Sequence, residues 1–279
     1  MNYDPIVNDP VGSDKEYPAS LKSLIIKSCG CNLLSTLLLA DGQGPHPVVL
    51  FLHGFPGNET NLDIAHAIRR MGWSVFLFHY RGTWGSDGDF SWENAVEDVK
   101  AAIDFLKSDD ALNNHRVNPN RIVLFGYSIG GFAAMMHAAK DDNIGSVTSI
   151  AGFNLGLVAD MIKQVPNGKE IALENLELGV SFVNGTSTHK LLDEMLANAK
   201  EFNLLNYAGV YTKKNILMIG ATYDTTAPLD IHYYPLVKKL QGMNPAKFQS
   251  MVMETGHGFS TKRIELTRTV INWLKEIKF

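Results

Sequence analysis

The hydrophobic positions of this chain fall mostly in short continuous runs, and polar segments with helical periodicity separate them. Such runs are typical of strands that are buried on both faces of a parallel sheet. The expected strands cover residues 47–52, 74–80, 121–125, 146–153, 215–220 and 248–253. The expected helices cover residues 60–70, 92–107, 132–139, 229–241 and 261–278. This alternation predicts βαβ crossovers and a mainly parallel sheet with helices on both faces.

Two segments depart from the alternation. Residues 21–27 and 33–40 are apolar stretches around a short polar turn, which predicts an antiparallel hairpin before the first parallel strand. Residues 154–214 have mostly helical patterning and no convincing strand, so we expect an insertion there. The predicted organisation is an N-terminal arm at 1–18, an α/β core at 19–153 and 215–279, and a helical cap insertion at 154–214.

The composition is that of an ordinary soluble globular protein, with 45% hydrophobic and 19% charged residues among 279. A formal net charge of -4 provides no basic field for nucleic acid or anionic lipid. We expect no membrane span and no signal peptide, because the sequence has neither a long apolar run nor a basic, apolar start. Cys29 and Cys31 are too close for an easy disulfide, so free thiols and a cytoplasmic location are expected.

A Gly-x-Ser-x-Gly motif centred on Ser128 follows the apolar run at 121–125 and leads into a helix of small residues. A serine at such a sharp turn is held in a strained conformation with its hydroxyl projecting outward. Gly126 and Gly130 remove side chains that would collide where strand and helix cross. The first N–H groups of the helix also point to this place. The motif predicts a nucleophilic serine beside an oxyanion site, and the alternative is an ordinary turn with a capping serine.

Loops at the carboxyl ends of two later strands contain suitable partners for Ser128. The loop after Ile219 contains Asp224, and the loop after Met253 contains His257 between two glycines. The order Ser, Asp, His is that of the α/β-hydrolase triad. The competing interpretations are that Asp224 only caps the next helix and that His257 is an ordinary loop histidine.

These motifs resemble those of the α/β-hydrolase-fold serine hydrolases. The resemblance rests on His53-Gly54-Phe55-Pro56-Gly57, the Ser128 motif, Asp224 and His257, and it covers residues 47–279. Within the family the chain is most similar to esterases and to cinnamoyl-esterase-like or dipeptidyl-peptidase-like hydrolases, whose loops carry Tyr80-Arg81-Gly82 followed by Gly85-Ser86-Asp87-Gly88. It differs from the prolyl oligopeptidase group in having no room for an N-terminal propeller. The resemblance implies an α/β-hydrolase fold with a mostly parallel central sheet and a helical cap.

The resemblance also implies a role for each site residue. Ser128 attacks the substrate carbonyl, His257 acts as the base, and Asp224 orients the imidazole. The expected oxyanion-hole donors are the backbone N–H groups of Phe55 and Ile129. Phe55 is favoured within its loop because the next residue, Pro56, has no N–H to donate. This mechanism requires no cofactor and no metal.

The predicted substrate-binding residues are Trp84 and Tyr127, although Tyr127 also suits core packing. The apolar content of residues 154–214 suggests an acyl or aromatic pocket, or else a subdomain that buries its own apolar stripes. The predicted function is hydrolysis of a small-molecule carboxylic ester through an acyl-enzyme. A peptidase or amidase, a thioesterase and a non-catalytic binding protein of the same fold are the alternatives. The oligomeric state stays open, with a homodimer among the candidates.

Overall fold

An eight-stranded sheet lies at the centre of this computed structural model, which describes residues 3–245 and 247–279. The strands are β1 Ser20–Ser28, β2 Cys31–Leu39, β3 His46–Leu52, β4 Ser74–Phe78, β5 Val117–Tyr127, β6 Ser146–Ile150, β7 Asn215–Ala221 and β8 Phe248–Met253. They lie in the order β1-β2-β4-β3-β5-β6-β7-β8. Strands β3 to β8 are parallel, and the β1–β2 hairpin joins β4 in the antiparallel direction. The predicted mostly parallel sheet is confirmed.

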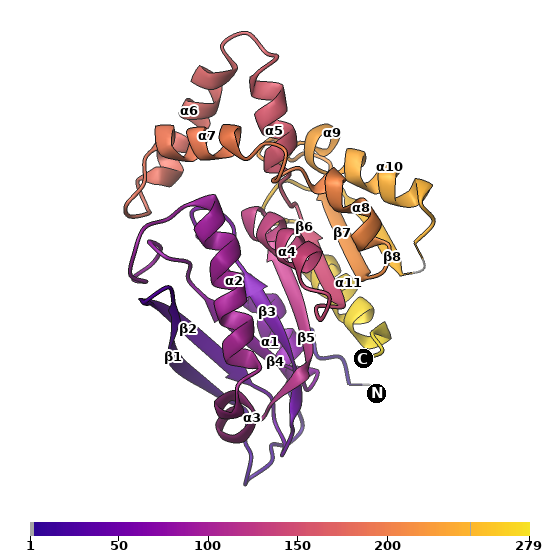
Figure 1. The fold of residues 1–279 in the computed structure, drawn as a ribbon. Helices are drawn as coiled ribbons and strands as arrows, with labels where there is room; N and C mark the ends of the chain where they lie inside the picture. The colour runs from indigo at the N-terminus through magenta and orange to yellow at the C-terminus, as the bar shows by residue number, and fades with distance from the viewer. Residues whose placement is uncertain (1–2, 246) are drawn as a thin grey trace.

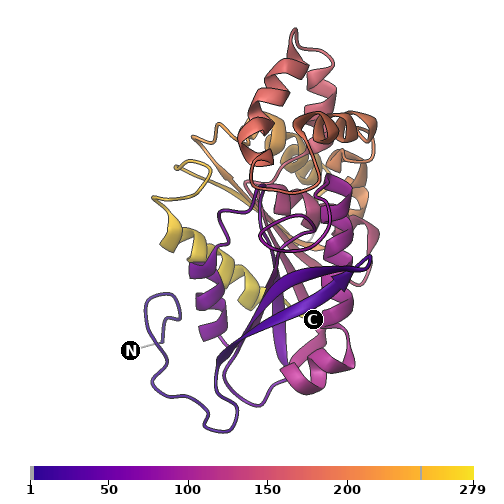
Figure 2. The ribbon, with the colours of Figure 1, turned by 90° about the vertical axis from the view of Figure 1, so that its left-hand side faces the viewer.

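Helices cover both faces of this sheet. Helices α1 (Leu62–Arg70) and α11 (Arg263–Glu276) lie on one face, and α2 (Trp92–Leu106) and α4 (Ile129–Lys140) lie on the other (Figure 1). Figure 2, turned by 90°, separates these two layers on opposite sides of the strands. The smaller elements are α3 Asp109–His115, the 3-10 helix Leu204–Tyr207, α8 Ala208–Tyr211, α9 Leu229–His232 and α10 Tyr234–Gly242.

Strand β3 needs cover on both faces because the residues from Val48 to Leu52 are all apolar and point alternately to the two faces. In β3, Val48, Leu50 and Leu52 belong to the core under α2 and α4, whereas Val49 and Phe51 belong to the core under α1 and α11. None of these five side chains is more than 3% exposed. Such a strand therefore appears in the sequence as an unbroken apolar run.

Three helices follow β6 and project beyond the carboxyl ends of the parallel strands (Figure 1). They are α5 Leu155–Ile162, α6 Gly168–Val180 and α7 Thr188–Ala197. We refer to residues 154–214, which separate β6 from β7, as the helical segment. Its position puts these helices at the edge of the sheet where ligands bind in open α/β folds.

The predicted helix over residues 229–241 is wrong in one respect, because the structure divides it into α9 and α10 at Tyr233. Pro235 stands in the first turn of α10. A proline has no N–H for an intrahelical bond and clashes with the preceding turn, so it starts a helix more readily than it continues one.

The N-terminal residues run along the layer formed by α1 and α11. Arg70 Nε donates to the carbonyl oxygen of Pro5 at 2.6 Å, and Arg268 forms an ion pair with Asp4 at 2.9 Å. The first residues that the structure describes therefore lie against the surface of the core.

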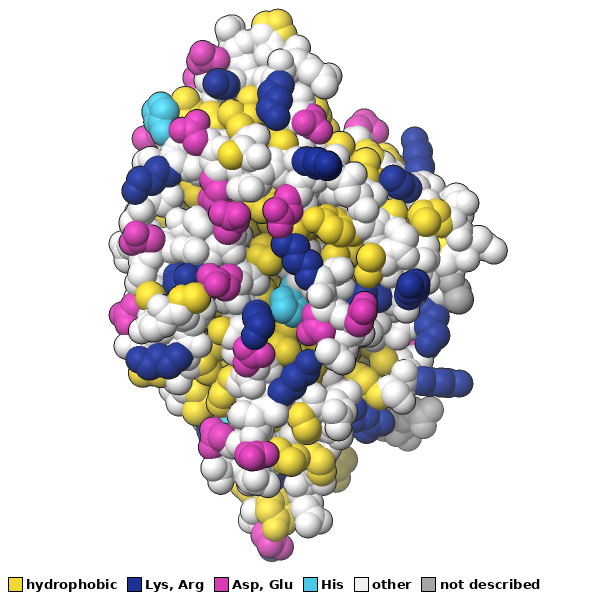
Figure 3. All heavy atoms as spheres, in the orientation of Figure 1, with side chains coloured by type: hydrophobic (Ala, Val, Ile, Leu, Met, Phe, Trp, Pro, Cys, Tyr) yellow, Lys and Arg dark blue, Asp and Glu magenta, His cyan; other side chains and the backbone are white. Residues whose placement is uncertain are grey.

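The face formed by α2 and α4 carries charges of both signs (Figure 3). Lys100 pairs with Asp104 at 2.5 Å, and Lys140 pairs with Glu201 at 2.5 Å. Acidic and basic side chains are interspersed on this face, so neighbouring charges largely offset one another.

Candidate active site

Ser128 forms the turn between β5 and α4 in a backbone conformation that non-glycine residues rarely adopt, with φ 56° and ψ -124°. The surrounding main chain holds it there. Its N–H donates to the carbonyl of Ile150 at 2.9 Å, and a Cβ at Gly130 would lie only 1.9 Å from the carbonyl oxygen of Leu52. The turn is therefore fixed by close packing of backbone against backbone.

The structure brings together the three residues predicted as a triad. His257 Nε2 lies 3.1 Å from Ser128 Oγ, and His257 Nδ1 lies 2.7 Å from Asp224 Oδ2. An ionised carboxylate only accepts hydrogen bonds, so in the neutral form of the imidazole the hydrogen lies on Nδ1. Nε2 is then left to accept the hydroxyl hydrogen of Ser128. The arrangement can therefore transfer a proton from the serine to the histidine.

Asp224 is held in its charged form by donors on both carboxylate oxygens. Burial raises the pKa of Asp224, but the hydrogen bonds from His257 and from the N–H groups of Ala227 and Thr226 together bring it below its ordinary value of 3.8. The backbone donors lie 2.7 Å and 2.9 Å from Oδ1. These bonds also fix the carboxylate in space, so it can hold the ring of His257.

The segments that carry the two predicted oxyanion donors both adjoin Ser128. Ile129 is the first residue of α4, where a helix leaves its N–H without an intrahelical acceptor. Gly54, one residue before Phe55, approaches so closely that a Cβ there would lie 3.2 Å from Ser128 Oγ. The loop that carries Phe55 is thus adjacent to the serine hydroxyl.

His53 fixes the orientation of the peptide that contains the N–H of Phe55. Its Nδ1 lies 2.7 Å from the carbonyl oxygen of Gly54, and a carbonyl only accepts, so Nδ1 carries the hydrogen. The Gly54 carbonyl and the Phe55 N–H belong to one planar peptide and point in opposite directions. Burial lowers the pKa of His53 to about 3, so this ring is neutral. This contact lets His53 brace the loop that carries Phe55.

Trp84 and Tyr127, the predicted substrate-binding residues, differ in their surroundings. Tyr127 is 5% exposed, and its hydroxyl donates to the carbonyl of His257 at 3.1 Å. This contact favours the packing role that the sequence left open for Tyr127. Trp84 is 43% exposed, and its indole Nε1 donates to the carbonyl of Pro56 at 2.8 Å. Trp84 therefore lies on the surface beside the loop that carries Phe55.

Three residues near the site were not found from the sequence. The ring of Phe153 lies 6.4 Å from that of His257 and 4.4 Å from that of His232. Burial lowers the pKa of His232 to about 4, and its Nδ1 accepts the N–H of Asn154. In α6, a Cβ at Gly179 would lie 2.1 Å from the ring of Phe55. The sequence could have indicated Phe153, because this residue follows closely after a strand. It could not have indicated the contact of Gly179 with Phe55, which depends on packing alone.

The described residues contain no group of three or more His, Cys, Asp and Glu side chains that could hold a metal ion. No helix in the same part of the chain is long and apolar enough to cross a membrane. Both cysteines are free thiols.

A model of the alpha/beta hydrolase family matches residues 49–258 of the chain. Curated relatives include the quorum-quenching protein AidA of Acinetobacter baumannii (strain MDR-ZJ06), 31% identical over 41% of this chain and 38% of that protein. The uncharacterized protein YfhR of Escherichia coli (strain K12) is 28% identical over 52% of this chain and 49% of its own length. The matched regions thus span half or less of these relatives.

Solved structures with the same fold extend over nearly all of the chain. Est1E from Butyrivibrio proteoclasticus with bound ferulic acid has a TM-score of 0.68, 20% identity, and coverage of 91% of this chain and 98% of its own. The Pyrococcus furiosus esterase PF2001 has a TM-score of 0.64, 18% identity, and coverage of 96% and 97%. The Pyrococcus horikoshii acylaminoacyl peptidase has a TM-score of 0.70, 16% identity, and coverage of 94% of this chain but 42% of its own. At such identities the likeness concerns the fold, and it confirms the predicted fold class.

Proposed function

The chain belongs to the alpha/beta hydrolase family, and from this premise we propose that it is a serine hydrolase that cleaves carboxylic esters through an acyl-enzyme. One observation carries the proposal: His257 has Ser128 Oγ at 3.1 Å from one ring nitrogen and the Asp224 carboxylate at 2.7 Å from the other. A serine hydroxyl is a weak nucleophile until a base of this kind accepts its proton.

The reaction begins when Ser128 Oγ attacks the ester carbonyl and its proton passes to His257 Nε2. The N–H groups of Phe55 and Ile129 stabilise the oxyanion of the tetrahedral intermediate. His257 then gives its proton to the departing alcohol, which leaves an acyl group on Ser128. Water, deprotonated by His257, attacks that acyl group and releases the acid. Asp224 remains ionised throughout and stabilises the imidazolium.

Esters are favoured over peptides because two esterases share this fold over almost their entire lengths. Peptide hydrolysis is the second candidate, since an acylaminoacyl peptidase shares the fold over 94% of this chain. We propose that the helical segment acts as a cap over the substrate, because α6 contacts Phe55 through Gly179. The free thiols support a reducing compartment such as the cytoplasm.

The test is hydrolysis of p-nitrophenyl esters from acetate to palmitate, beside a feruloyl ester and an aminoacyl-p-nitroanilide. We expect ester turnover by the wild type and a loss of about 10^4-fold or more in Ser128→Ala. A fluorophosphonate should label the wild type but not the variant. Cleavage of the anilide alone would favour the peptidase, and a Ser128→Ala variant with full activity would overturn the assignment of the nucleophile. A wild type that neither turns over nor reacts with the fluorophosphonate would favour a binding protein.

A further inference from the structure

Trp84 connects two parts of the molecule that border the proposed oxyanion hole. Its indole Nε1–H donates to the carbonyl oxygen of Pro56 at 2.8 Å. Its ring lies nearly parallel to that of Phe182, with centroids 6.4 Å apart and an interplanar angle of 20°. Pro56 belongs to the loop 53–57, and Phe182 belongs to the helical segment. One side chain therefore contacts both the loop that carries a proposed oxyanion donor and the segment above it.

The loop 53–57 is held at a carbonyl on each side of Phe55. His53 Nδ1 donates to the carbonyl before it, and Trp84 Nε1 donates to the carbonyl of the residue after it. Gly57 then turns with φ 111°, and a Cβ there would lie 2.6 Å from Trp84 Nε1 and 2.8 Å from His53 Nδ1. The loop is thus packed between the two rings. His53 orients the Phe55 peptide directly, and Trp84 is the second hydrogen-bonding side chain that limits its movement.

We propose that Trp84 is a positioning residue for the oxyanion hole, acting through its hydrogen bond to the Pro56 carbonyl. The bond keeps the loop 53–57 in the position from which the Phe55 N–H reaches the reacting carbonyl oxygen. This inference rests on the proposed serine hydrolase function. It assigns Trp84 a role in stabilising the transition state instead of the substrate contact expected from the sequence.

The backbone of Trp84 is itself in an unusual conformation. Its φ is 47°, in the left-handed region where a bulky residue is a genuine outlier. Such a conformation persists only where the surroundings determine it. The hydroxyl of Thr83 donates to the carbonyl of Tyr80 at 2.8 Å, and the N–H of Ser86 donates to the carbonyl of Thr83 at 2.9 Å. These bonds on both sides hold the turn in which Trp84 lies.

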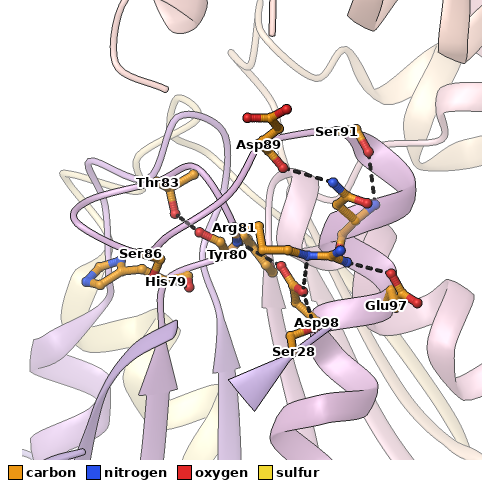
Figure 4. Close-up of polar contacts among 11 residues, drawn as sticks. Ser28, His79, Tyr80, Arg81, Thr83, Ser86, Asp89, Ser91, Glu97 and Asp98 are labelled. Atoms are coloured by element: carbon orange, nitrogen blue, oxygen red, sulfur yellow. Dashed lines mark hydrogen bonds and ion pairs between the residues drawn. The ribbon is translucent and has the colours of Figure 1, made fainter. Parts of the chain in front are cut away.

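A buried ion pair anchors the start of this turn (Figure 4). Asp98, in α2, has no exposed surface, and it accepts hydrogen bonds from Arg81 N at 2.8 Å, Arg81 Nε at 2.7 Å and Ser28 Oγ at 2.6 Å. Arg81 also pairs with Glu97 at 2.6 Å. The charged groups of Arg81 and Asp98 each form several hydrogen bonds. These bonds fix the backbone at Arg81, three residues before Trp84.

The helical segment is joined to the same turn by main-chain bonds. Asn184 N donates to the carbonyl of Gly82 at 2.8 Å, and Phe90 N donates to the carbonyl of Asn184 at 3.0 Å. These bonds do not depend on the side chain of Trp84. A substitution of the indole can therefore remove the bond to Pro56 while the turn and the helical segment stay joined.

The experiment compares Trp84→Phe, which keeps an aromatic ring beside Phe182 but lacks the N–H, with Phe182→Ala, which keeps the N–H. Both are measured with the best ester of the panel and with a trifluoromethyl ketone of the same acyl group, which forms an oxyanion on Ser128. For Trp84→Phe we expect kcat to fall about 10- to 100-fold with KM nearly unchanged. Its affinity for the ketone should fall by a similar factor. Phe182→Ala should instead alter KM and leave kcat near that of the wild type.

A Trp84→Phe variant with wild-type kcat, or with a loss confined to KM, would overturn the role of Trp84 and leave the serine mechanism intact. If this variant does not fold, Trp84→Gly replaces it, because glycine adopts the positive φ without strain. The glycine variant should show the same loss of kcat. A wild type that cleaves no ester and is not labelled by the fluorophosphonate would overturn both proposals together.

Discussion

The core and the helical segment approach the proposed active site in different ways. At Gly130 in α4, the atoms that a Cβ would meet are the carbonyl oxygens of Leu52 and His53, at 1.9 Å and 2.6 Å. At Gly179 in α6, they are ring atoms of Phe55, the nearest at 2.1 Å. Ser128 is thus positioned by main chain, whereas the contact between α6 and the loop 53–57 is made by the side chain of Phe55.

Burial separates the two regions in the same way. All residues of α4 except Ala139 and Lys140 are buried. In α6, by contrast, Gly168 and Gly179 are the only buried residues. Leu178 in α6 is 74% exposed. A helix with so few buried residues obtains little stability from packing, so we expect α6 to move more readily than α4.

Gly130→Ala should produce the largest change in stability. Alanine would gain about 1 kcal/mol of helix propensity, but its Cβ overlaps backbone that belongs to the central strand β3. We expect the free energy of unfolding to fall by about 3 kcal/mol or more, measured by urea denaturation. Gly242→Ala at the end of α10, where a Cβ meets no atom within 4 Å, is the control and should change little. If the Gly130→Ala protein is as stable as the wild type, the backbone around Gly130 is not rigidly packed, and the contrast between α4 and α6 is wrong.

Gly179→Ala should change activity more than stability. The Phe55 ring that it meets packs against Phe90 at 5.1 Å and Trp92 at 5.2 Å, so a shift of the ring displaces the loop that carries the Phe55 N–H. We expect kcat for the best ester to fall about 10-fold, since small displacements of a catalytic group are costly. The stability should change by less than about 1 kcal/mol, because the gain in helix propensity offsets part of the strain.

The control for this variant is Gly209→Ala in α8, within the helical segment, where a Cβ has open space. It should keep the wild-type kcat. If Gly179→Ala keeps it too, α6 does not influence the oxyanion loop. A loss of stability as large as that of Gly130→Ala would mean that α6 is as rigidly packed as α4.

The same contrast decides what the sequence could predict. The fold and the meeting of Ser128, Asp224 and His257 follow from loops at the carboxyl ends of parallel strands, which share one edge of the sheet. The division of the predicted helix at Tyr233 was also readable, because Pro235 breaks helical bonding. The bond from Trp84 to Pro56 and the contact of Gly179 with Phe55 were not, since they join segments whose relative position only packing determines.

Glu194→Gln tests how the helical segment is attached to α2. Of the variants considered, it should have the smallest effect on the free energy of unfolding. The carboxylate of Glu194, in α7, accepts the N–H groups of Trp92 and Glu93 at 3.0 Å and 2.7 Å, at the N-terminus of α2. Burial raises the pKa of Glu194 above its ordinary value of 4.5, with a contribution from the charge of Glu93, and the hydrogen bonds offset this only in part. The folded state therefore binds the proton of Glu194 more tightly than the unfolded state does.

The consequence has a definite sign. The stability linked to Glu194 is fully present below pH 4.5 and is lost as the pH rises through the raised pKa of the folded state. Glutamine does not titrate, so the wild type should lose stability relative to Glu194→Gln as the pH increases from about 4 to 7. Urea unfolding of both proteins across this range measures the difference, which should be a fraction of the Gly130→Ala effect. A difference that is constant with pH would mean that the bonds from α2 fully offset burial, and one that increases in favour of the wild type would mean that they outweigh it. The carboxylate would then hold the helical segment to the core more firmly than we infer.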